Sequence, residues 1–552
     1  MPEDWRTIAA HRRKEIYDRI PAEYLVDTTL LAQQKLIDLP YRCGLLTPQE
    51  LRITEHTAVE LLRRIHDGTY SAVEVTKAFC KRAAIAHQAG CTNCLAYVMF
   101  KEALDAAAAL DEYMRVEGKP KGPLHGLPIS VKEHVYLVGT PATSGLMAWA
   151  DQMSPEDALL VRVLREAGAV FHVKTTNPQT LMAIETDSNL FGRTVNPHNT
   201  ALTPGGSSGG EGALIAMRGS LLGIGTDIGG SIRVPSGFCG IYGIKPSVAR
   251  IPHGGLTGLH DGMENIVGVC GPMATCIDDL NLFCQVVLDS EPWHHEPSLV
   301  EIPWKANLEP PKKMIIGVLW NDGIVQPHPP VSRALQEAVV ALRQAGHTII
   351  EWKPYYHAEL IDCINKAYFL DGGREYREMM KEAGEPAVPI IEWILNTVAK
   401  KEYTLQESWL INAERNRLRT LYSEQLRQTQ VDAILCPVGP SVASAHDESR
   451  YWGYCSVFNA LDFSAAVLPV STVKETDTWE RYPRVSEKPL SDIDAWYESL
   501  YGKGTDGPRK YCDAPVSLQL VSRRFQEEKL LAVMASVDGV LQDRSKLPAN
   551  GY

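Results

Sequence analysis

The sequence predicts an α/β fold with a mixed, mostly parallel central sheet that is covered by helices on both faces. Two stretches carry this prediction, because each joins a helical pattern to a strand-like run. Residues 158–175 (ALLVRVLREAGAVFHVKT) read as helix, glycine turn and strand, and residues 314–352 repeat that alternation. Strands that alternate with helices are typical of a parallel sheet buried between two helical layers.

The composition indicates a large globular protein that is not built to bind nucleic acid. Of the 552 residues, 45% are hydrophobic and 22% are charged, which is ordinary for a chain with a sizeable core. Lys and Arg total 55 against 67 Asp and Glu, so the formal net charge is −12, and no long basic run stands out. A protein that mainly binds phosphate backbones carries the opposite charge. We therefore expect no nucleic-acid partner.

Residues 1–52 predict a helical extension in front of the main domain, which we place at residues 53–540. The opening MPEDWRTIAAHRRKEIYDRIP is charged from Glu3 onward and reads as an amphipathic helix. It lacks the roughly 7–15-residue apolar core of a signal peptide. No apolar run along the chain approaches the roughly 20 residues of a membrane span. We therefore expect a cytoplasmic protein with no stable membrane insertion.

Helices and short strands follow in order along the main domain. Residues 58–68 and 71–88 have apolar side chains at helical spacing, and residues 128–135 (PISVKEHV) read as a short strand after Gly and Pro punctuation. Residues 355–430 predict a helical insertion that shapes the substrate site. Residues 514–537 close the core with a strand and then a helix.

The twelve cysteines predict reduced core thiols rather than a metal site. Most lie in apolar surroundings, as in PSGFCGIYG and AILCPVG. Only Cys91 and Cys94 form a CxxC, with no second pair and no nearby pair of histidines. A lone CxxC is a weak signal for metal or redox chemistry. We expect no metal.

Residues 203–233, TPGGSSGGEGALIAMRGSLLGIGTDIGGSIR, stand out for their glycines and serines. A flexible linker has no buried periodicity, whereas ALIAMRG and LLGIGTD read as a buried helix and a buried strand. No Lys follows the glycines as a Walker loop requires, and no strand precedes them as a dinucleotide turn requires. Gly206 to Gly210 formally satisfy GxSxG, which leaves a nucleophile elbow at Ser208 as an alternative, but that motif also needs a preceding strand.

Simple geometry predicts that the two Gly/Ser loops of this stretch meet. A helix of about ten residues from Gly210 advances about 15 Å, and a six-residue strand from Leu221 returns about 20 Å. Ser207 or Ser208 could then lie beside Ser231. The amides of the intervening glycine turn would face a common point, as the oxyanion of acyl transfer needs.

A serine nucleophile needs a base, and Lys132 is the candidate outside this stretch. No histidine lies within residues 203–233. Lys132 sits in the largely apolar PISVKEHV, and burial pushes a lysine toward its neutral, proton-accepting form. The alternative is a solvent-facing lysine on a strand.

Two segments in register resemble the amidase signature family. They are GGSSGGEGALIAMRGSLLGIGTDIGGSIRVPSGFCGIYGIKP, residues 205–246, and GPLHGLPISVKEHV, residues 122–135. The likeness spans about Ile53 to Val537 and is highly specific, and within the family the chain is most similar to the fungal acetamidases. The signature segment is also similar to that of fatty-acid amide hydrolases. The resemblance implies a single large amidase signature fold.

The resemblance also implies a catalytic role for three residues. Ser231 matches the nucleophile, and Ser207 matches a bridging serine that follows a cis peptide after Gly206. Lys132 matches the general base. The following Glu133 departs from the Asp that many members carry, which leaves the local hydrogen bonding open.

Further residues match the family's oxyanion hole, its acyl pocket and its supporting network. The amides of Ile228, Gly229, Gly230 and Ser231 match the oxyanion donors. Leu181, Met182 and Ala183 fall where the family contacts substrate. The supporting residues are Ser208, Thr226, Asp227 and Arg233, with ordinary turn capping as their alternative.

The implied activity is hydrolysis of a carboxylic amide to the acid and ammonia or an amine, through an acyl-serine. Small aliphatic or aryl amides are the expected substrates. Alternatives are a fatty-acid amide hydrolase, a specialised biosynthetic amidase or esterase, and a subunit of an amidotransferase. No cofactor is implied. The oligomeric state stays open, with a homodimer as the family precedent.

Overall fold

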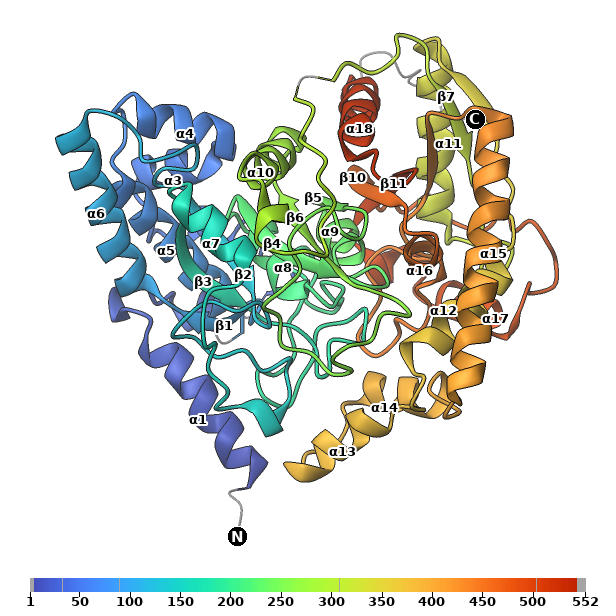
Figure 1. Ribbon diagram of the computed structural model, residues 1–552, viewed down its shortest axis with the longest axis horizontal. Coiled ribbons are helices and arrows are strands. Elements are labelled where there is room, and N and C mark those ends of the chain that lie inside the picture. The colour runs from blue at the N-terminus through green and yellow to red at the C-terminus, as the bar shows by residue number, and fades with distance from the viewer. Residues whose placement is uncertain (1–3, 32, 89, 307, 503, 544–552) are drawn as a thin grey trace.

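A single mixed sheet of 11 strands forms the centre of the molecule, in the order β1-β3-β2-β4-β6-β5-β10-β11-β9-β7-β8 (Figure 1). The computed structural model describes residues 4–31, 33–88, 90–306, 308–502 and 504–543. The strands are β1 Leu95–Val98, β2 Pro128–Lys132, β3 Val170–Thr175, β4 Leu222–Asp227, β5 Tyr242–Lys245, β6 Val269–Ala274, β7 Ile315–Val318, β8 Thr348–Glu351, β9 Ala433–Pro437, β10 Ser464–Thr472 and β11 Pro515–Ser522.

The α-helices precede, connect and follow these strands. They are α1 Trp5–Asp18, α2 Leu39–Arg42, α3 Pro48–Glu55, α4 Ala58–His66, α5 Ala72–His87, α6 Phe100–Glu117, α7 Leu159–Glu166, α8 Gly209–Ala216, α9 Arg233–Cys239, α10 Ile277–Asp289, α11 Pro329–Gln344, α12 His357–Tyr368, α13 Arg374–Glu382, α14 Pro389–Thr397, α15 Leu405–Thr429, α16 Gly453–Ala460, α17 Asp492–Tyr501 and α18 Glu527–Gln542. None of the helices in the described ranges combines the length and apolar character needed to cross a membrane.

The predicted α/β fold with a mixed sheet is confirmed, but the expectation that its strands are mostly parallel is wrong. Among the described strands, the pairs β3·β2, β2·β4, β9·β7 and β7·β8 are parallel, and the six other neighbouring pairs are antiparallel. The two stretches that suggested a parallel sheet are the helical crossovers from β2 to β3 and from β7 to β8. The central strands follow other connections, since β5 reaches β6 through a loop with no helix.

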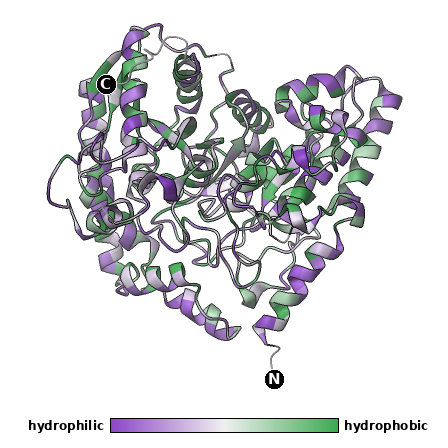
Figure 2. Ribbon diagram, turned by 180° about the vertical axis from the view of Figure 1, so that it is seen from behind, coloured by the Kyte–Doolittle hydropathy of each residue, from purple (hydrophilic) through white to green (hydrophobic). Residues whose placement is uncertain are grey.

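Helices cover both faces of the sheet, as neighbouring residues of β5 show. A Cβ on Gly243 would meet Ser236 of α9, whereas the Tyr242 hydroxyl bonds to Asp538 of α18 on the other side. Adjacent strand residues point to opposite faces, so α9 and α18 lie on opposite sides. Seen from behind, hydrophobic residues gather along the sheet and hydrophilic ones along the outer helices (Figure 2). The core is continuous from β2 to β11.

Two peripheral segments flank this core. The N-terminal extension carries α1 to α3, and α3 crosses the expected domain boundary at residues 52–53. Residues 355–430 form α12 to α15, which lie along one side of the molecule (Figure 1). Tyr368, the last residue of α12, reaches the loop after β4, where its hydroxyl donates to the Ile228 carbonyl at 2.8 Å.

Candidate active site

Strand β2 carries Lys132 into the interior, with its amine beside two hydroxyl groups. All five residues of the strand are buried, and Lys132 is fully buried. Its Nζ atom lies 2.7 Å from Ser207 Oγ and 2.8 Å from Thr226 Oγ1. The alternative of a solvent-facing lysine is therefore wrong.

Burial lowers the pKa of Lys132 to about 7, because the interior disfavours the ammonium. Asp227, Cys270, Glu211 and Glu133 pull the pKa of this lysine upward but do not restore its usual value. At neutral pH a large fraction of the amine is unprotonated. It can then accept a proton, which a surface lysine cannot do at that pH.

The two Gly/Ser loops meet, as predicted. Helix α8 leads away from the first loop, β4 returns to the second, and the amide of Ser208 donates to the Ser231 carbonyl at 3.1 Å. The peptide bond between Gly206 and Ser207 is cis. Ser208 is fully buried, and its hydroxyl lies 3.3 Å from the backbone of Thr226. That burial argues against the nucleophile elbow at Ser208.

Ser207 and Ser231 line one cavity of about 520 Å³. Ser231 is 6% exposed, and among the described residues its side chain has no hydrogen-bond partner, Ser207 included. The hydrogen bond from Lys132 thus reaches Ser207 and goes no further, and the Ser231 hydroxyl is free to face a ligand. Catalytic hydrogen bonds that are open in an unliganded enzyme often close around substrate.

Three of the four predicted oxyanion amides are free, and the fourth is not. Within the described ranges, no protein acceptor is bound by the amides of Ile228, Gly229 or Ser231. The amide of Gly230 instead donates to Asp227 Oδ1 at 2.8 Å. Gly230 has φ +131°, and a Cβ there would lie 2.9 Å from Cys455 Cβ, so this turn requires glycine. In this arrangement Gly230 shapes the turn and does not offer its own amide.

Asp227 organises the turn through a buried ion pair with Arg233. Arg233 Nε lies 3.0 Å from Asp227 Oδ2, and both side chains are fully buried. The same carboxylate accepts the amide of Ile232 at 3.1 Å. Burial raises the pKa of Asp227, but the guanidinium outweighs that effect and holds the pKa well below its usual range. The full burial of the pair rules out a surface salt bridge, whereas the amides that Asp227 accepts show that its carboxylate does cap the turn.

His134 is a site residue that the sequence did not single out. Its Nδ1 lies 2.9 Å from the Thr257 carbonyl, which can only accept, so Nδ1 is assigned the hydrogen. Burial lowers the pKa of His134 well below its usual value, so the ring is neutral and Nε2 accepts. The Thr226 hydroxyl, 3.0 Å from Nε2, therefore donates to His134. That leaves its oxygen as an acceptor for Lys132.

Glu133, which replaces the Asp of many family members, forms its hydrogen bonds with residues other than the candidate catalytic serines. Its buried carboxylate accepts the amides of Thr143 at 2.5 Å and Ser144 at 3.0 Å. Burial raises the pKa of Glu133, and the buried Lys174 counteracts that rise. Glu133 thus fixes the segment after β2 and so holds Lys132 in place.

Apolar side chains line the cavity around Ser231. Leu181 and Met182 line both the large cavity and a smaller one, whereas Ala183 lines only the smaller. The large cavity also takes lining from Tyr368 and Tyr376 of the helical insertion.

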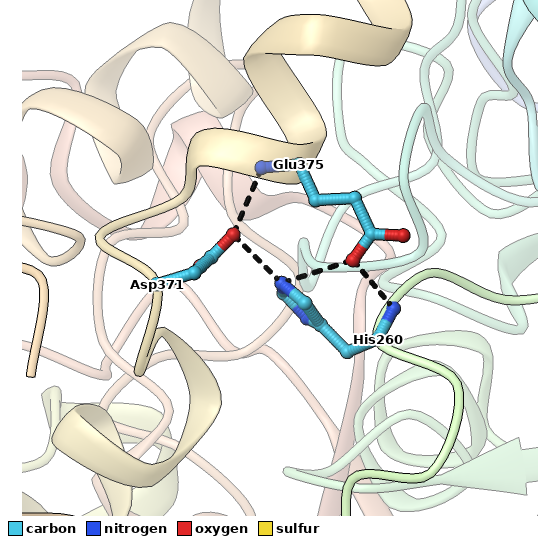
Figure 3. Close-up of side chains that lie close together, drawn as sticks. All are labelled: His260, Asp371 and Glu375. Atoms are coloured by element: carbon cyan, nitrogen blue, oxygen red, sulfur yellow. Dashed lines mark hydrogen bonds and ion pairs between the residues drawn. The ribbon is translucent and has the colours of Figure 1, made fainter. Parts of the chain in front are cut away.

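Three residues that could hold a metal ion by distance lie beside this cavity. The ligand atoms of His260, Asp371 and Glu375 fall within 4.8 Å of one another (Figure 3). His260 Nε2 lies 3.1 Å from Asp371 and 3.5 Å from Glu375. Both carboxylates already accept backbone amides, from Gly373 and Glu375 to Asp371 and from His260 to Glu375. The cluster therefore acts as a joint, meaning a set of contacts that links the loop between β5 and β6, which carries His260, to α13.

Comparisons with known proteins place the chain among amide hydrolases. A protein-family model described as Amidase matches residues 74–531. The chain is 40% identical over 551 residues to an acetamidase of Aspergillus oryzae, covering 97% of this chain and 99% of the relative. It is also 40% identical over 555 residues to an acetamidase of Emericella nidulans, with 98% and 99% covered.

Solved structures show the same fold. A structure of a fatty acid amide hydrolase superposes with a TM-score of 0.90 at 33% sequence identity, covering 98% of this chain and 95% of that chain. A bacterial aryl acylamidase of the amidase signature family has a TM-score of 0.69 at 19% identity, covering 89% of this chain and 99% of that one. At that identity the second likeness bears on the fold alone.

Proposed function

The chain belongs to the amidase family and is a hydrolase of amide bonds, and on that premise we propose that it works through an acyl-serine formed on Ser231. The observation that supports the proposal is the buried amine of Lys132, which lies 2.7 Å from Ser207 Oγ in the cavity that Ser231 also lines. Nucleophile, relay and base would then form a Ser-Ser-Lys triad. The name acetamidase, which two relatives carry, supports small amides as the substrates of this chain.

In the first half-reaction the Ser231 hydroxyl attacks the carbonyl carbon. Its proton passes to Ser207, whose own proton passes to the neutral Lys132 amine. The new carbon–oxygen bond forms as the carbonyl electron pair moves onto oxygen. The free amides of Ile228, Gly229 and Ser231 stabilise that oxyanion, and losing one such donor typically costs about 10²–10³ in rate.

The proton then returns to the leaving nitrogen. The Lys132 ammonium donates to Ser207, and Ser207 donates to the amine as the carbon–nitrogen bond breaks. Amines leave poorly unless they are protonated, so this step needs a donor next to the nitrogen. Water repeats the route on the acyl-serine, releases the acid and restores Ser231.

His134 serves this relay as a positioning residue. Because Thr226 donates to His134, its oxygen can only accept from the Lys132 amine. One amine hydrogen is thereby directed at Thr226, and the lone pair of neutral Lys132 is left for the Ser207 hydroxyl. A protonated His134 would reverse the Thr226 hydroxyl, and burial disfavours that state.

The helical insertion, residues 355–430, is the proposed substrate-shaping element. It supplies Tyr368 and Tyr376 to the cavity wall, and the joint of His260 with Asp371 and Glu375 couples it to the facing loop. A homodimer is the precedent of the family, with the oligomeric state of this chain left open, and the cytoplasmic location stays a prediction from the sequence. Sedimentation of the purified chain would test the first of these.

The proposed function is tested by ammonia release from acetamide, with Ser231→Ala as the control. We expect the parent to release ammonia and the variant to lose about 10³-fold or more in kcat. A Ser231→Ala variant as fast as the parent would contradict the proposed nucleophile.

A further inference from the structure

Two cavities of very different size meet at Ser231. The larger has a volume of about 520 Å³ and the smaller a volume of about 20 Å³. Besides Ser231, both are lined by Leu181, Met182, Ile228 and Tyr368. An amide that spans the two cavities at Ser231 would place one of its two halves in each.

The proton relay decides which half enters which cavity. The leaving nitrogen must take its proton from Ser207, and Ser207 lines the large cavity together with Thr226. The small cavity is lined by Ser231 and by the oxyanion segment at Ile228 and Gly229. The four substituents of the tetrahedral carbon point apart, so the amine half faces the large cavity and the acyl half faces the small one.

The small cavity fits no more than a short acyl group. A volume of about 10–15 Å³ holds one water, so about 20 Å³ matches a methyl group with little to spare. Tyr368 and Trp452 wall it in, and Trp452 is 9% exposed. Tyr368 is pinned by its hydrogen bond to the Ile228 carbonyl, and a Cβ on Gly229 would lie 2.6 Å from its hydroxyl. Moving Tyr368 to enlarge the small cavity would break its hydrogen bond to the Ile228 carbonyl.

The large cavity fits a bulky, mostly apolar amine. Its volume lies within the roughly 300–1,000 Å³ that is usual for sites of drug-sized ligands. Its apolar lining comes mainly from the loop between β5 and β6, with Ile251, Leu256, Leu259, Met263 and Ile266. Tyr376 faces this loop from α13, across the His260 joint.

We propose that the substrates are N-substituted amides of very short acids, such as acetamides whose nitrogen carries an apolar or aromatic group. The inference rests on the proposed function, since the proton relay through Ser207 sets the orientation. It separates this chain from an enzyme for primary amides of long fatty acids, whose acyl chain would need the space that Tyr368 and Trp452 fill.

The test compares kcat/KM within two pairs of amides. The members of each pair differ in the size of one substituent and share the amide bond that is hydrolysed. Acetamide against hexanamide probes the acyl side, and N-benzylacetamide against N-methylacetamide probes the amine side. We expect acetamide to exceed hexanamide by about tenfold or more and N-benzylacetamide to exceed N-methylacetamide by about tenfold, as misfit and fit in an apolar pocket typically give.

Variants on each side sharpen the assignment. Trp452→Ala should raise the ratio of kcat/KM for hexanamide to that for acetamide by about tenfold. Trp452→Phe should raise the same ratio by less, and it keeps the test usable if Trp452→Ala does not fold. Met263→Ala, on the amine side, should lower the ratio of N-benzylacetamide to N-methylacetamide while leaving the acyl ratio unchanged.

The possible results distinguish failure of the proposed substrate class from failure of the proposed amidase activity. Hydrolysis with hexanamide preferred over acetamide, or with N-methylacetamide preferred over N-benzylacetamide, would overturn the inference and leave the amidase intact. Failure to hydrolyse any of the four amides would overturn the proposed function, and the inference with it.

Discussion

The Nζ atom of Lys132 lies 2.7 Å from the Oγ atom of Ser207, although 75 residues separate them in sequence. The contact exists because β2, which carries the lysine, is a direct neighbour of β4, and the loop after β4 meets the loop of Ser207 through the hydrogen bond from the Ser208 amide to the Ser231 carbonyl. A buried amine whose pKa is lowered and which lies beside a hydroxyl can serve as a general base for that hydroxyl.

The rate should depend on pH through the charge of Lys132. The pKa of this amine lies at about 7, and only its neutral form accepts a proton. We expect kcat/KM to rise as pH increases through about 7 and then to level off. A pH profile of acetamide hydrolysis from pH 5 to 9 checks this. Lys132→Arg should be inactive at every pH in that range, since a guanidinium stays charged.

Lys132 should also lower the stability of the protein in a pH-dependent way. Its folded pKa of about 7 lies below the ordinary lysine value, so the unfolded chain binds more protons between about pH 7 and pH 10. We expect Lys132→Met to be inactive yet more stable than the parent at pH 7. The gain should shrink by up to about 1.4 kcal/mol per pH unit on going toward pH 10.

Urea unfolding of both proteins at pH 7, 8 and 9 measures this difference. Because all other titrating groups are shared, they cancel in the comparison. A Lys132→Met variant that is less stable at pH 7, or a difference that does not change with pH, would show that the lysine is not held neutral by burial.

Thr226 and His134 should act as one unit. His134→Leu removes the acceptor that orients the Thr226 hydroxyl, so we expect kcat to fall about tenfold or more with little change in KM. Thr226→Val should cause a similar loss, and the double variant should lose no more than either single one. His134→Gln, whose amide offers both a donor and an acceptor, should recover part of the rate.

Kinetics of the four variants with acetamide test the coupling. Losses that add in the double variant, or a His134→Gln variant no better than His134→Leu, would show that His134 does not act through Thr226.

Asp227 should matter for stability more than any other carboxylate of the site. Asp227→Ala leaves the guanidinium of Arg233 buried without its counter-charge and frees the amides of Gly230 and Ile232. Breaking such a pair typically costs about 3–5 kcal/mol. We expect a loss of that size in urea unfolding, and a partial recovery when Arg233→Met is added. Equal stability of parent and Asp227→Ala would be incompatible with the ion pair.

The local features of the site could be predicted from the sequence better than the long-range ones. A buried helix and a buried strand between two Gly/Ser loops suffice to predict that the loops meet, because helix and strand lengths are fixed by their rise per residue. The direction of the central strands did not follow, since two βα crossovers say nothing about strands joined by loops. For that reason the prediction of mostly parallel strands fails at β5, β6, β10 and β11.

The missed parts of the site depend on where side chains point. Gly230 looked like an oxyanion donor because glycine turns expose amides, and only the placement of the Asp227 carboxylate shows that this amide is taken. His134 follows Lys132 by two residues, which was a usable signal for a neighbour of the base. Its partner Thr257 lies 123 residues further on, and that contact sets the tautomer.

An acyl group on Ser231 is the central requirement of the proposed mechanism. The most direct measurement is peptide mass spectrometry of enzyme quenched with acid during turnover of an activated acetyl ester such as 4-nitrophenyl acetate. We predict an acetyl group on Ser231 in the parent and acetylation slowed by about 10²–10⁴-fold in Lys132→Met. An acetyl group on Ser207 or Ser208 instead, or steady turnover with Ser231 unmodified, would contradict it.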